Sequence, residues 1–180
     1  SGYSGEELVR LLLHHPQVEL TAVTSRQNAG QTLAQVFPRF SSHPKARALR
    51  FADPNSALLA NQAEIVFLAL PHGVAAEYAI PLLQAGCVVI DLSADFRLKD
   101  PAVYKEFYGH DHPAPDLLRK SVYGLPEVYR REIRESLLVA SPGCYPTSIL
   151  LPLLPLVRRK LVKPQSLIAD RSEEHTSELQ

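Results

Sequence analysis

The stretch EIVFLALPHGVAAEYAIPLLQAGCVVIDLS, residues 64–93, decides the fold because it predicts a strand, a helix and a strand in succession. Residues 64–70 are nearly all apolar, which is typical of a strand covered on both faces of its sheet. Residues 73–86 predict a helix that ends at Gly86, with Pro81 placed to kink it, and residues 87–93 predict a second buried strand. This alternation indicates an α/β fold with a parallel, doubly wound, Rossmann-like sheet.

Two further helices are predicted outside this stretch. Residues 5–15 carry leucines at helical spacing and stop at Pro16. Residues 147–160 predict an apolar helix, although Pro152 and Pro155 argue against its regularity because an internal proline removes a backbone hydrogen bond.

The remaining segments follow the same logic. Residues 18–25 are β-branched and apolar, and residues 136–141 are similar, so both predict strands. Residues 167–170 are interpreted as the start of a strand of a next domain. Residues 96–120 are polar and rich in proline, so we expect an irregular excursion with one short helix.

Composition excludes several classes of protein. The chain has 180 residues, of which 46% are hydrophobic, and its 19 basic and 19 acidic side chains give a formal net charge of zero. This balance lacks the positive charge of a nucleic-acid binder, and no apolar run is long enough for a membrane helix. Two cysteines make no disulfide framework, so we expect a cytoplasmic protein.

Both ends of the sequence are interpreted as cut. No methionine is present, and the first residues resemble the middle of a motif. Residues 171–180, RSEEHTSELQ, match the translation of a common sequencing-library adapter and are interpreted as an artefact. His175 is therefore given no function.

The carboxyl ends of the predicted strands carry the candidate cofactor residues, as expected for ligand sites of parallel sheets. Gly2 and Gly5 open the first helix and are interpreted as part of a phosphate-binding G-x-x-G turn, with an ordinary glycine turn as the alternative. Ser25 and Arg26 end a strand where NADP-binding folds place groups for the 2′-phosphate, the alternative being a solvated arginine. The turn 71–73 is tight enough to pass close to a cofactor, and its histidine is interpreted as a turn residue rather than a catalytic one.

A second group of polar residues alternates along one segment. Asp91, Ser93, Asp95 and Arg97 would share one face if the backbone were extended. Arg97 is then predicted to hold an anionic group of a substrate, with Asp95 orienting it. The alternative is a strand end with an exposed ion pair.

The two cysteines receive different interpretations. Cys87 opens a buried strand and is expected to pack in the core. Cys144 lies between a strand and a helix, directly after Gly143, where the helix dipole and free N–H groups favour a thiolate and can stabilise an oxyanion. A buried loop cysteine is the alternative.

Six segments occur in one order and spacing that resembles a known family. They are SGYSGEELVRLL (1–12), TSRQNAG (24–30), LALPHG (68–73), DLSADFRL (91–98), YGLPE (123–127) and PGCYPT (142–147). Together they resemble the N-acetyl-gamma-glutamyl-phosphate reductases, NADP-dependent enzymes of arginine biosynthesis. PGCYPT is the most specific of the six.

The resemblance implies roles for individual residues. It implies a cysteine nucleophile at Cys144, and cofactor contacts from Gly2, Tyr3, Ser4, Gly5, Ser25, Arg26, Pro71, His72 and Gly73. Ser93, Asp95, Arg97 and Glu127 are implied near the substrate. The acid–base histidine of the family lies in a segment beyond this sequence, so His110 and His112 are not taken as replacements.

The resemblance also implies the wider organisation. It implies an NADP-binding Rossmann-like domain over residues 1–143, the start of a catalytic and oligomerisation domain over 144–170, and a homo-oligomer. The expected reaction reduces N-acetyl-gamma-glutamyl phosphate to the semialdehyde with NADPH, although the fragment alone is expected to be inactive. The alternatives are a reductase of carrier-bound aminoadipyl or glutamyl phosphate or of aspartyl phosphate, and, from another class, a non-catalytic NADP-binding module.

Overall fold

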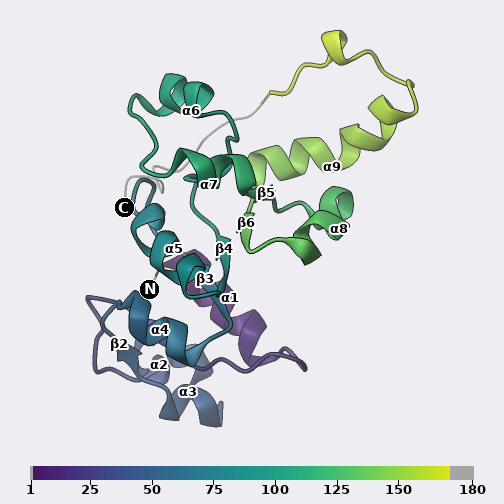
Figure 1. The fold of residues 1–180 in the computed structure, drawn as a ribbon. Coiled ribbons are helices and arrows are strands. Elements are labelled where there is room, and N and C mark those ends of the chain that lie inside the picture. Colours follow the sequence, from purple (N-terminus) through teal and green to yellow (C-terminus); the bar gives the residue numbers. More distant parts are fainter. Residues whose placement is uncertain (1, 171–180) are drawn as a thin grey trace. The chain divides into compact units, whose positions relative to one another are not determined.

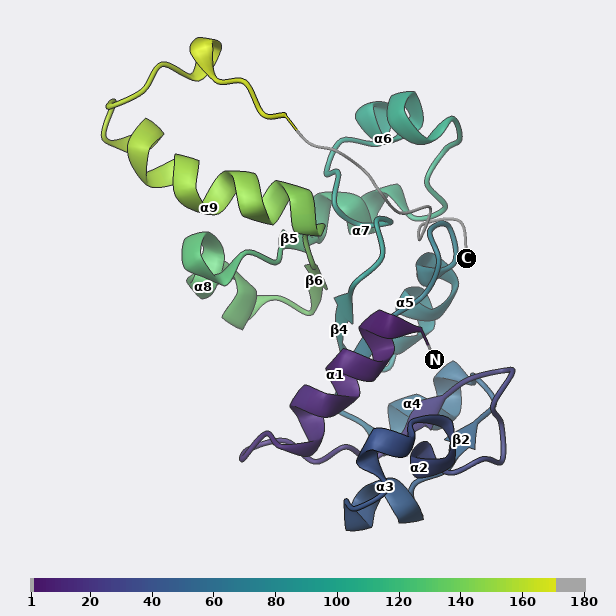
Figure 2. The same ribbon diagram turned by 180° about the vertical axis from the view of Figure 1, so that it is seen from behind.

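A computed structural model describes residues 2–170 and contains α-helices and short strands (Figures 1 and 2). The α-helices are α1 Tyr3–Leu13, α2 Leu33–Val36, α3 Pro44–Ala48, α4 Ser56–Gln62, α5 Ala75–Gln84, α6 Pro101–Tyr108, α7 Pro115–Lys120, α8 Pro126–Glu135 and α9 Cys144–Arg158. The strands are β1 Val23–Thr24, β2 Phe51–Ala52, β3 Ile65–Leu68, β4 Val88–Asp91, β5 Val122–Tyr123 and β6 Leu138–Ala140. Two short 3₁₀ turns, Pro38–Phe40 and Pro164–Ser166, complete the described elements.

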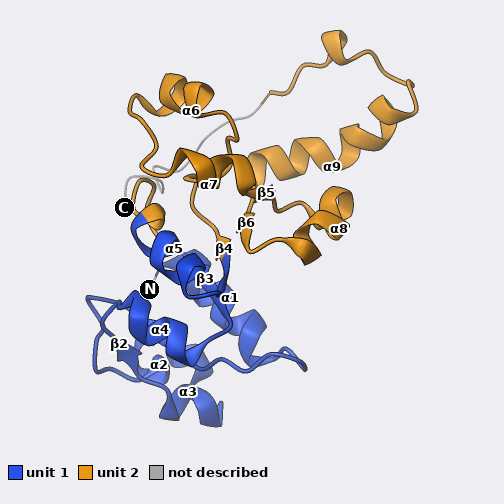
Figure 3. Cartoon of the chain, viewed as in Figure 1, with its two compact units in different colours: residues 1–69, 77–89 blue, residues 70–76, 90–180 orange. Residues whose placement is uncertain are grey.

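The described chain divides into two compact units (Figure 3). Unit 1 comprises the described residues up to 69 together with 77–89. Unit 2 comprises residues 70–76 and the described residues from 90 onward. The domain boundary expected at residue 143 stays a prediction.

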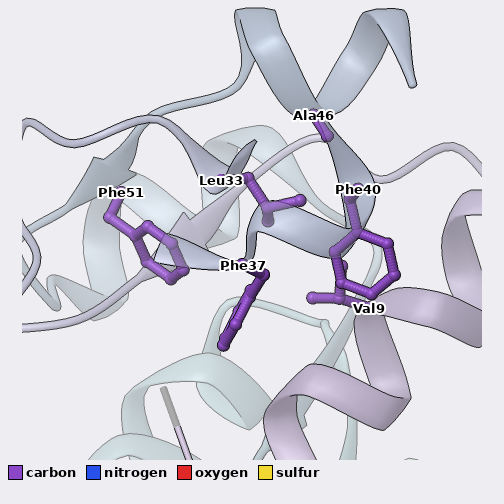
Figure 4. Close-up of a cluster of buried hydrophobic side chains, with 6 residues drawn as sticks. All are labelled: Val9, Leu33, Phe37, Phe40, Ala46 and Phe51. Atoms are coloured by element: carbon purple, nitrogen blue, oxygen red, sulfur yellow. The ribbon is translucent and has the colours of Figure 1, made fainter. Parts of the chain in front are cut away.

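An aromatic and aliphatic cluster forms a core of unit 1 (Figure 4). Its buried members are Val9, Leu33, Phe37, Phe40, Ala46 and Phe51. The ring of Phe37 packs edge to face against Phe40 and Phe51, with 6.1 Å between ring centroids in each pair. This packing holds the N-terminal helix and the short β1–β2 pair together, since β1 and β2 are too short to be stable alone. β1 pairs with β2 in parallel, Val23 opposite Phe51.

The other sheet has the strand order β3-β4-β6-β5. β5 pairs with β6 in parallel, with Val122 opposite Val139, and all three residues of β6 are buried. The buried strands predicted around residues 64–70, 87–93 and 136–141 are therefore present, and the α/β prediction is confirmed. β3 is not covered along its whole length, however, because Ile65 is 48% exposed.

Local capping explains several helix starts that the hydrophobic pattern did not predict. The Thr32 side chain accepts a hydrogen bond from the Gln35 backbone N–H while the Gln35 side chain accepts from the Thr32 N–H, a capping box that starts α2. The side chain of Asn55 caps α4, and that of Asp100 caps α6. Such caps stabilise helices too short to form by propensity.

Four expectations about secondary structure were wrong or too broad. Residues 96–120 hold two helices, α6 and α7, instead of one. The strand expected over 18–25 is limited to the two residues of β1, and residues 167–170 form no strand. α9 runs from Cys144 to Arg158 with Pro152 and Pro155 inside it, so the two prolines do not end the helix.

No helix among residues 2–170 is long and apolar enough to cross a membrane. Residues 171–180, which were interpreted as an adapter artefact and include His175, lie outside the described residues.

Candidate functional site

Gly2 is the N-cap residue of α1, in an extended conformation, and among the described residues no side chain caps the helix. A Cβ atom built on Gly2 or Gly5 meets no other atom within 4 Å, and Tyr3 is largely exposed. The first N–H groups of a helix have no partner within it and attract anions, so a helix start of this kind is chemically suited to an anionic group.

Ser25 and Arg26 follow β1 in unit 1, as the sequence predicted. The Ser25 N–H donates to the Ala52 carbonyl at 3.0 Å, and its hydroxyl accepts from the Asn28 side chain at 3.3 Å. Arg26 is exposed, and its Nη2 donates to the Tyr78 hydroxyl at 3.1 Å. The sequence did not point to Tyr78, because it lies on α5, 52 residues from Arg26, and a single tyrosine on a helix shows no pattern that links it to an arginine.

The turn 71–73 is anchored by a residue far along the chain. The backbone N–H groups of Gly73 and Ala75 donate to the two carboxylate oxygens of Asp95, at 2.7 and 2.9 Å. Nδ1 of His72 lies 2.7 Å from the same carboxylate. Gly73 has φ +84°, a left-handed conformation that favours glycine. The sequence placed the turn correctly but gave no sign of its anchor.

The segment 91–97 is bent, not extended, so the predicted shared face is wrong. β4 ends at Asp91, whose carboxylate accepts from the N–H and the hydroxyl of Ser93 at 2.9 and 2.8 Å. The Ser93 hydroxyl in turn accepts from the N–H of Asp95 at 3.2 Å. These side-chain to backbone bonds two residues apart compete with a sheet ladder and turn the chain.

Burial has an electrostatic consequence at Asp91. Its side chain is fully buried, and this burial raises the pKa of the carboxyl, although the bonds from Ser93 oppose the change. Ser93 and Asp95 are also buried; the Ser93 hydroxyl bonds within the segment, whereas the Asp95 carboxylate bonds to the turn 71–75. The structure thus gives Asp91, Ser93 and Asp95, like Arg97, partners within the protein.

Arg97 holds the turn that precedes Cys144. Its Nε donates to the Ser141 carbonyl at 2.8 Å and its Nη2 to the Leu92 carbonyl at 3.1 Å. Nη1 lies against Gly143, where an added Cβ would come within 3.2 Å of it. The expectation that Asp95 orients Arg97 is wrong: backbone carbonyls orient the guanidinium, and Asp95 is used by the turn 71–75.

Cys144 is exposed and is the first residue of α9. Gly143 is the N-cap, in an extended conformation, and its carbonyl accepts from both the N–H and the hydroxyl of Thr147 at 3.1 and 2.9 Å. Pro146 has no N–H, so it loses nothing in the first helical turn. A thiol in this position feels the positive end of the helix dipole.

The other cysteine behaves as predicted. Cys87 is 3% exposed, and its Sγ donates to the Ala63 carbonyl at 3.5 Å. It packs in the core and carries no site.

The segment YGLPE adjoins β6 through Gly124. The Gly124 N–H donates to the Ala140 carbonyl at 2.7 Å, and a Cβ there would lie 3.0 Å from Val139 Cγ1. Glu127 is exposed in the first turn of α8. A glycine at residue 124 lets the two backbone segments approach closely, one residue beyond the β5–β6 pair.

A cluster of aromatic and histidine rings surrounds His72 in unit 2. Tyr108 stacks on His72 with 4.2 Å between ring centroids, and Tyr104 lies 4.6 Å from Tyr108. Burial, reinforced by the charge of Asp95, raises the pKa of Tyr104 to about 12. His112 is buried, which lowers its pKa, and its Nδ1 accepts from the Ala114 N–H at 2.9 Å.

Comparisons with known proteins give one family and many relatives. The family model "Semialdehyde dehydrogenase, NAD binding domain" matches residues 1–136. N-acetyl-gamma-glutamyl-phosphate reductases from Akkermansia muciniphila and Nitrosococcus oceani are 56% and 48% identical over 170 residues, 94% of this chain and 49% of theirs. The chain thus spans about half the length of the curated relatives it matches.

Solved structures of lower identity share the fold. Aspartate semialdehyde dehydrogenase II from Vibrio cholerae, complexed with ASA, is 20% identical and has a TM-score of 0.61, covering 88% of this chain and 44% of its own. Aspartate semialdehyde dehydrogenase with NADP from Candida albicans is 17% identical with the same TM-score and the same coverage.

Proposed function

From the premise that this chain belongs to the semialdehyde dehydrogenase family through its NAD-binding domain, we propose that it is part of an NADPH-dependent N-acetyl-gamma-glutamyl-phosphate reductase. The relatives at 46–56% identity carry that name, whereas the aspartate semialdehyde dehydrogenases, at 17–21%, share only the fold. The substrate is a small molecule and the pathway is arginine biosynthesis.

The observation that carries the proposal is the position of Cys144. It is exposed at the start of α9, and the guanidinium of Arg97 lies against the residue before it. A thiolate at a helix N-terminus is a good nucleophile, and a nearby arginine favours an anionic substrate. A buried loop cysteine, the alternative from sequence, would be shielded from any substrate.

The chemistry of the proposed site has two stages. The Cys144 thiolate attacks the acyl carbon of the acyl phosphate, the C–O bond to phosphate breaks, and a thioester remains on Cys144. Backbone N–H groups at the start of α9 stabilise the oxyanion of the attack. NADPH, when bound, supplies the hydride that reduces the thioester. The thiohemiacetal on Cys144 then releases the aldehyde, and the sulfur regains its electron pair as thiolate.

Each residue proposed for the cofactor has the chemistry for one part of a dinucleotide. Gly2, Tyr3, Ser4 and Gly5, at the N-terminal end of α1, are proposed for the pyrophosphate. Exposed Arg26 offers a fork of donors to the 2′-phosphate of NADP, with Ser25 beside it. Pro71, His72 and Gly73 are proposed to approach the nicotinamide end.

The substrate side is proposed more narrowly than the sequence suggested. Arg97 keeps donors on Nη1 for an anionic group, and Glu127 is exposed on α8. Ser93 and Asp95 are buried, so we propose that they act on the substrate only through the backbone they hold.

The wider organisation is proposed from the same family membership. Residues 1–143 would belong to the cofactor domain and 144–170 would begin the catalytic and oligomerisation domain. The match of the family model to residues 1–136 supports this division. We place the enzyme in the cytoplasm as a homo-oligomer.

The test uses the full-length protein. It should reduce NADP in the presence of N-acetylglutamate semialdehyde, and only when phosphate is added. Cys144→Ser should lower kcat by at least about 10³-fold, because a hydroxyl replaces the nucleophile. Cys87→Ala is the matched control and should retain activity, since Cys87 lies in the core. Near-normal activity of Cys144→Ser would refute the nucleophile.

A further inference from the structure

The buried carboxylate of Asp95 makes three contacts for which the proposed reaction gives no reason. It is 1% exposed, yet it belongs to the loop after β4 and has no ion pair with Arg97. Its three partners, described above, all lie on the segment 72–75: two backbone N–H groups and one imidazole nitrogen. A buried carboxylate needs such donors, because losing its hydration is costly without them.

The contacts of Asp95 reach both ends of the segment 72–75. One carboxylate oxygen accepts from Gly73 and lies beside His72, while the other accepts from Ala75, the first residue of α5. An acidic group at a helix start also interacts favourably with the helix dipole. On its other side the His72 ring stacks against Tyr108, 4.2 Å between centroids. The backbone and the ring are thus fixed from both directions.

We propose that Asp95 is a positioning residue that fixes the turn 71–75 in the conformation in which it meets the nicotinamide cofactor. The inference rests on the proposed function, because that function assigns the turn to the cofactor. Asp95 acts through Gly73, Ala75 and His72 and need not touch the cofactor itself.

An amide cannot replace this carboxylate. Asparagine has one acceptor oxygen, so its NH₂ group would face either the Gly73 or the Ala75 N–H, donor against donor. In Asp95→Asn the turn therefore loses at least one bond to a charged acceptor and shifts. Loss of such a bond weakens a coupled binding step by about tenfold or more.

The same short segment also holds the turn before Cys144. The Ser141 N–H donates to the Asp91 carbonyl at 2.7 Å, and the Ser141 carbonyl accepts from Arg97. The segment 91–97 thus holds two turns: Asp95 holds the turn 71–75, and Arg97 holds the turn before Cys144. This arrangement lets an experiment separate the two effects, because Asp95→Asn leaves the Arg97 anchor in place.

The experiment compares full-length wild type, Asp95→Asn and the control Asp111→Asn, whose carboxylate is exposed on the surface. Three quantities are measured: NADP affinity by fluorescence titration, hydrogen exchange of the peptide containing residues 70–76, and alkylation rates of Cys144 and Cys87. We expect Asp95→Asn to weaken NADP about tenfold and to speed exchange at 70–76. Alkylation of Cys144 should change by less than about twofold, and Cys87 should stay protected.

Several results would overturn the inference. Wild-type NADP affinity in Asp95→Asn would do so, and so would an equal loss in Asp111→Asn. If Asp95→Asn unfolds, Cys87 becomes reactive, and His72→Phe then decides, since it keeps a ring against Tyr108 and removes only the third contact of Asp95. Because His72 is itself proposed to approach the cofactor, the quantity compared is hydrogen exchange in the cofactor-free protein. His72→Phe should speed exchange at 70–76 about threefold at constant Cys87 protection, and unchanged exchange would overturn the inference. A wild type that fails to bind NADP at all refutes the proposed function instead.

Discussion

Replacing Gly124 by alanine tests how closely the chain after β5 must approach the end of β6. Gly124 does not have a left-handed φ, so backbone strain plays no part. The added Cβ would lie 3.0 Å from Val139 Cγ1, 3.1 Å from the Ala140 carbonyl oxygen and 3.2 Å from the Ser141 Cα. Two of these three neighbours are backbone atoms, which cannot rotate away.

The expected magnitude follows from two terms. Overpacking a tight site costs about 1–3 kcal/mol. Moving the strands apart also stretches the 2.7 Å bond from the Gly124 N–H to Ala140, whose net contribution is about 1 kcal/mol. We therefore expect the free energy of unfolding to fall by about 2–4 kcal/mol.

Urea denaturation followed by circular dichroism measures this loss. Gly5→Ala is the matched control, because its Cβ meets nothing within 4 Å and it lies inside α1. Alanine is better than glycine in a helix by about 1 kcal/mol, so the control should be neutral or stabilising. A change within about 0.5 kcal/mol for Gly124→Ala, or equal changes in both variants, would refute the packing argument.

Three further predictions test separate parts of the protein. Iodoacetamide should modify exposed Cys144 at least about 10²-fold faster than Cys87, which reacts only when the core opens, and equal rates by mass spectrometry would contradict the described burial. Arg26→Ala should weaken NADP about tenfold and NAD less than twofold in calorimetric titrations, with Tyr78→Phe between the two, whereas equal losses for both cofactors would remove Arg26 from the 2′-phosphate. Burial lowers the pKa of His112 from its ordinary value of 6.5, so the unfolded state binds more protons at mildly acidic pH than the folded state does. The free energy of unfolding of the wild type should therefore fall as the pH drops from about 7.5 to about 5.5. In His112→Phe this loss of unfolding free energy should be smaller.

Sequence patterns predicted the elements with enough residues to show a period. α1, α5, β4 and β6 have apolar faces or runs long enough to show a pattern, and the helix predicted over 147–160 is present as α9, which begins three residues earlier, at Cys144. β2 and β5 were not predicted, because two residues cannot show an alternation. α8 was missed as well: its surface is highly charged and none of its residues is buried.

The sequence predicted where the candidate site residues lie along the strands, but not which groups they contact. Strand ends located Arg26, the turn 71–73 and Cys144, because parallel sheets gather ligands at those ends. The partners of Asp95 and Arg97 were not predictable, since alternation of polar residues from 91 to 97 also suits a strand. The outcome depended on the Asp91 and Ser93 side chains bonding to backbone two residues on, which ends the strand.

The bent segment 91–97 also limits how this protein can be redesigned. The side chains of Asp91, Ser93 and Asp95 each accept a hydrogen bond from a backbone N–H. An apolar replacement at any of them leaves that N–H without its acceptor, at a cost of about 1–3 kcal/mol. Arg26 and Glu127 are exposed and can be varied at little cost to the fold. A library that aims to change cofactor preference or substrate range should therefore keep Asp91, Ser93 and Asp95 fixed and diversify exposed positions such as Arg26 and Glu127.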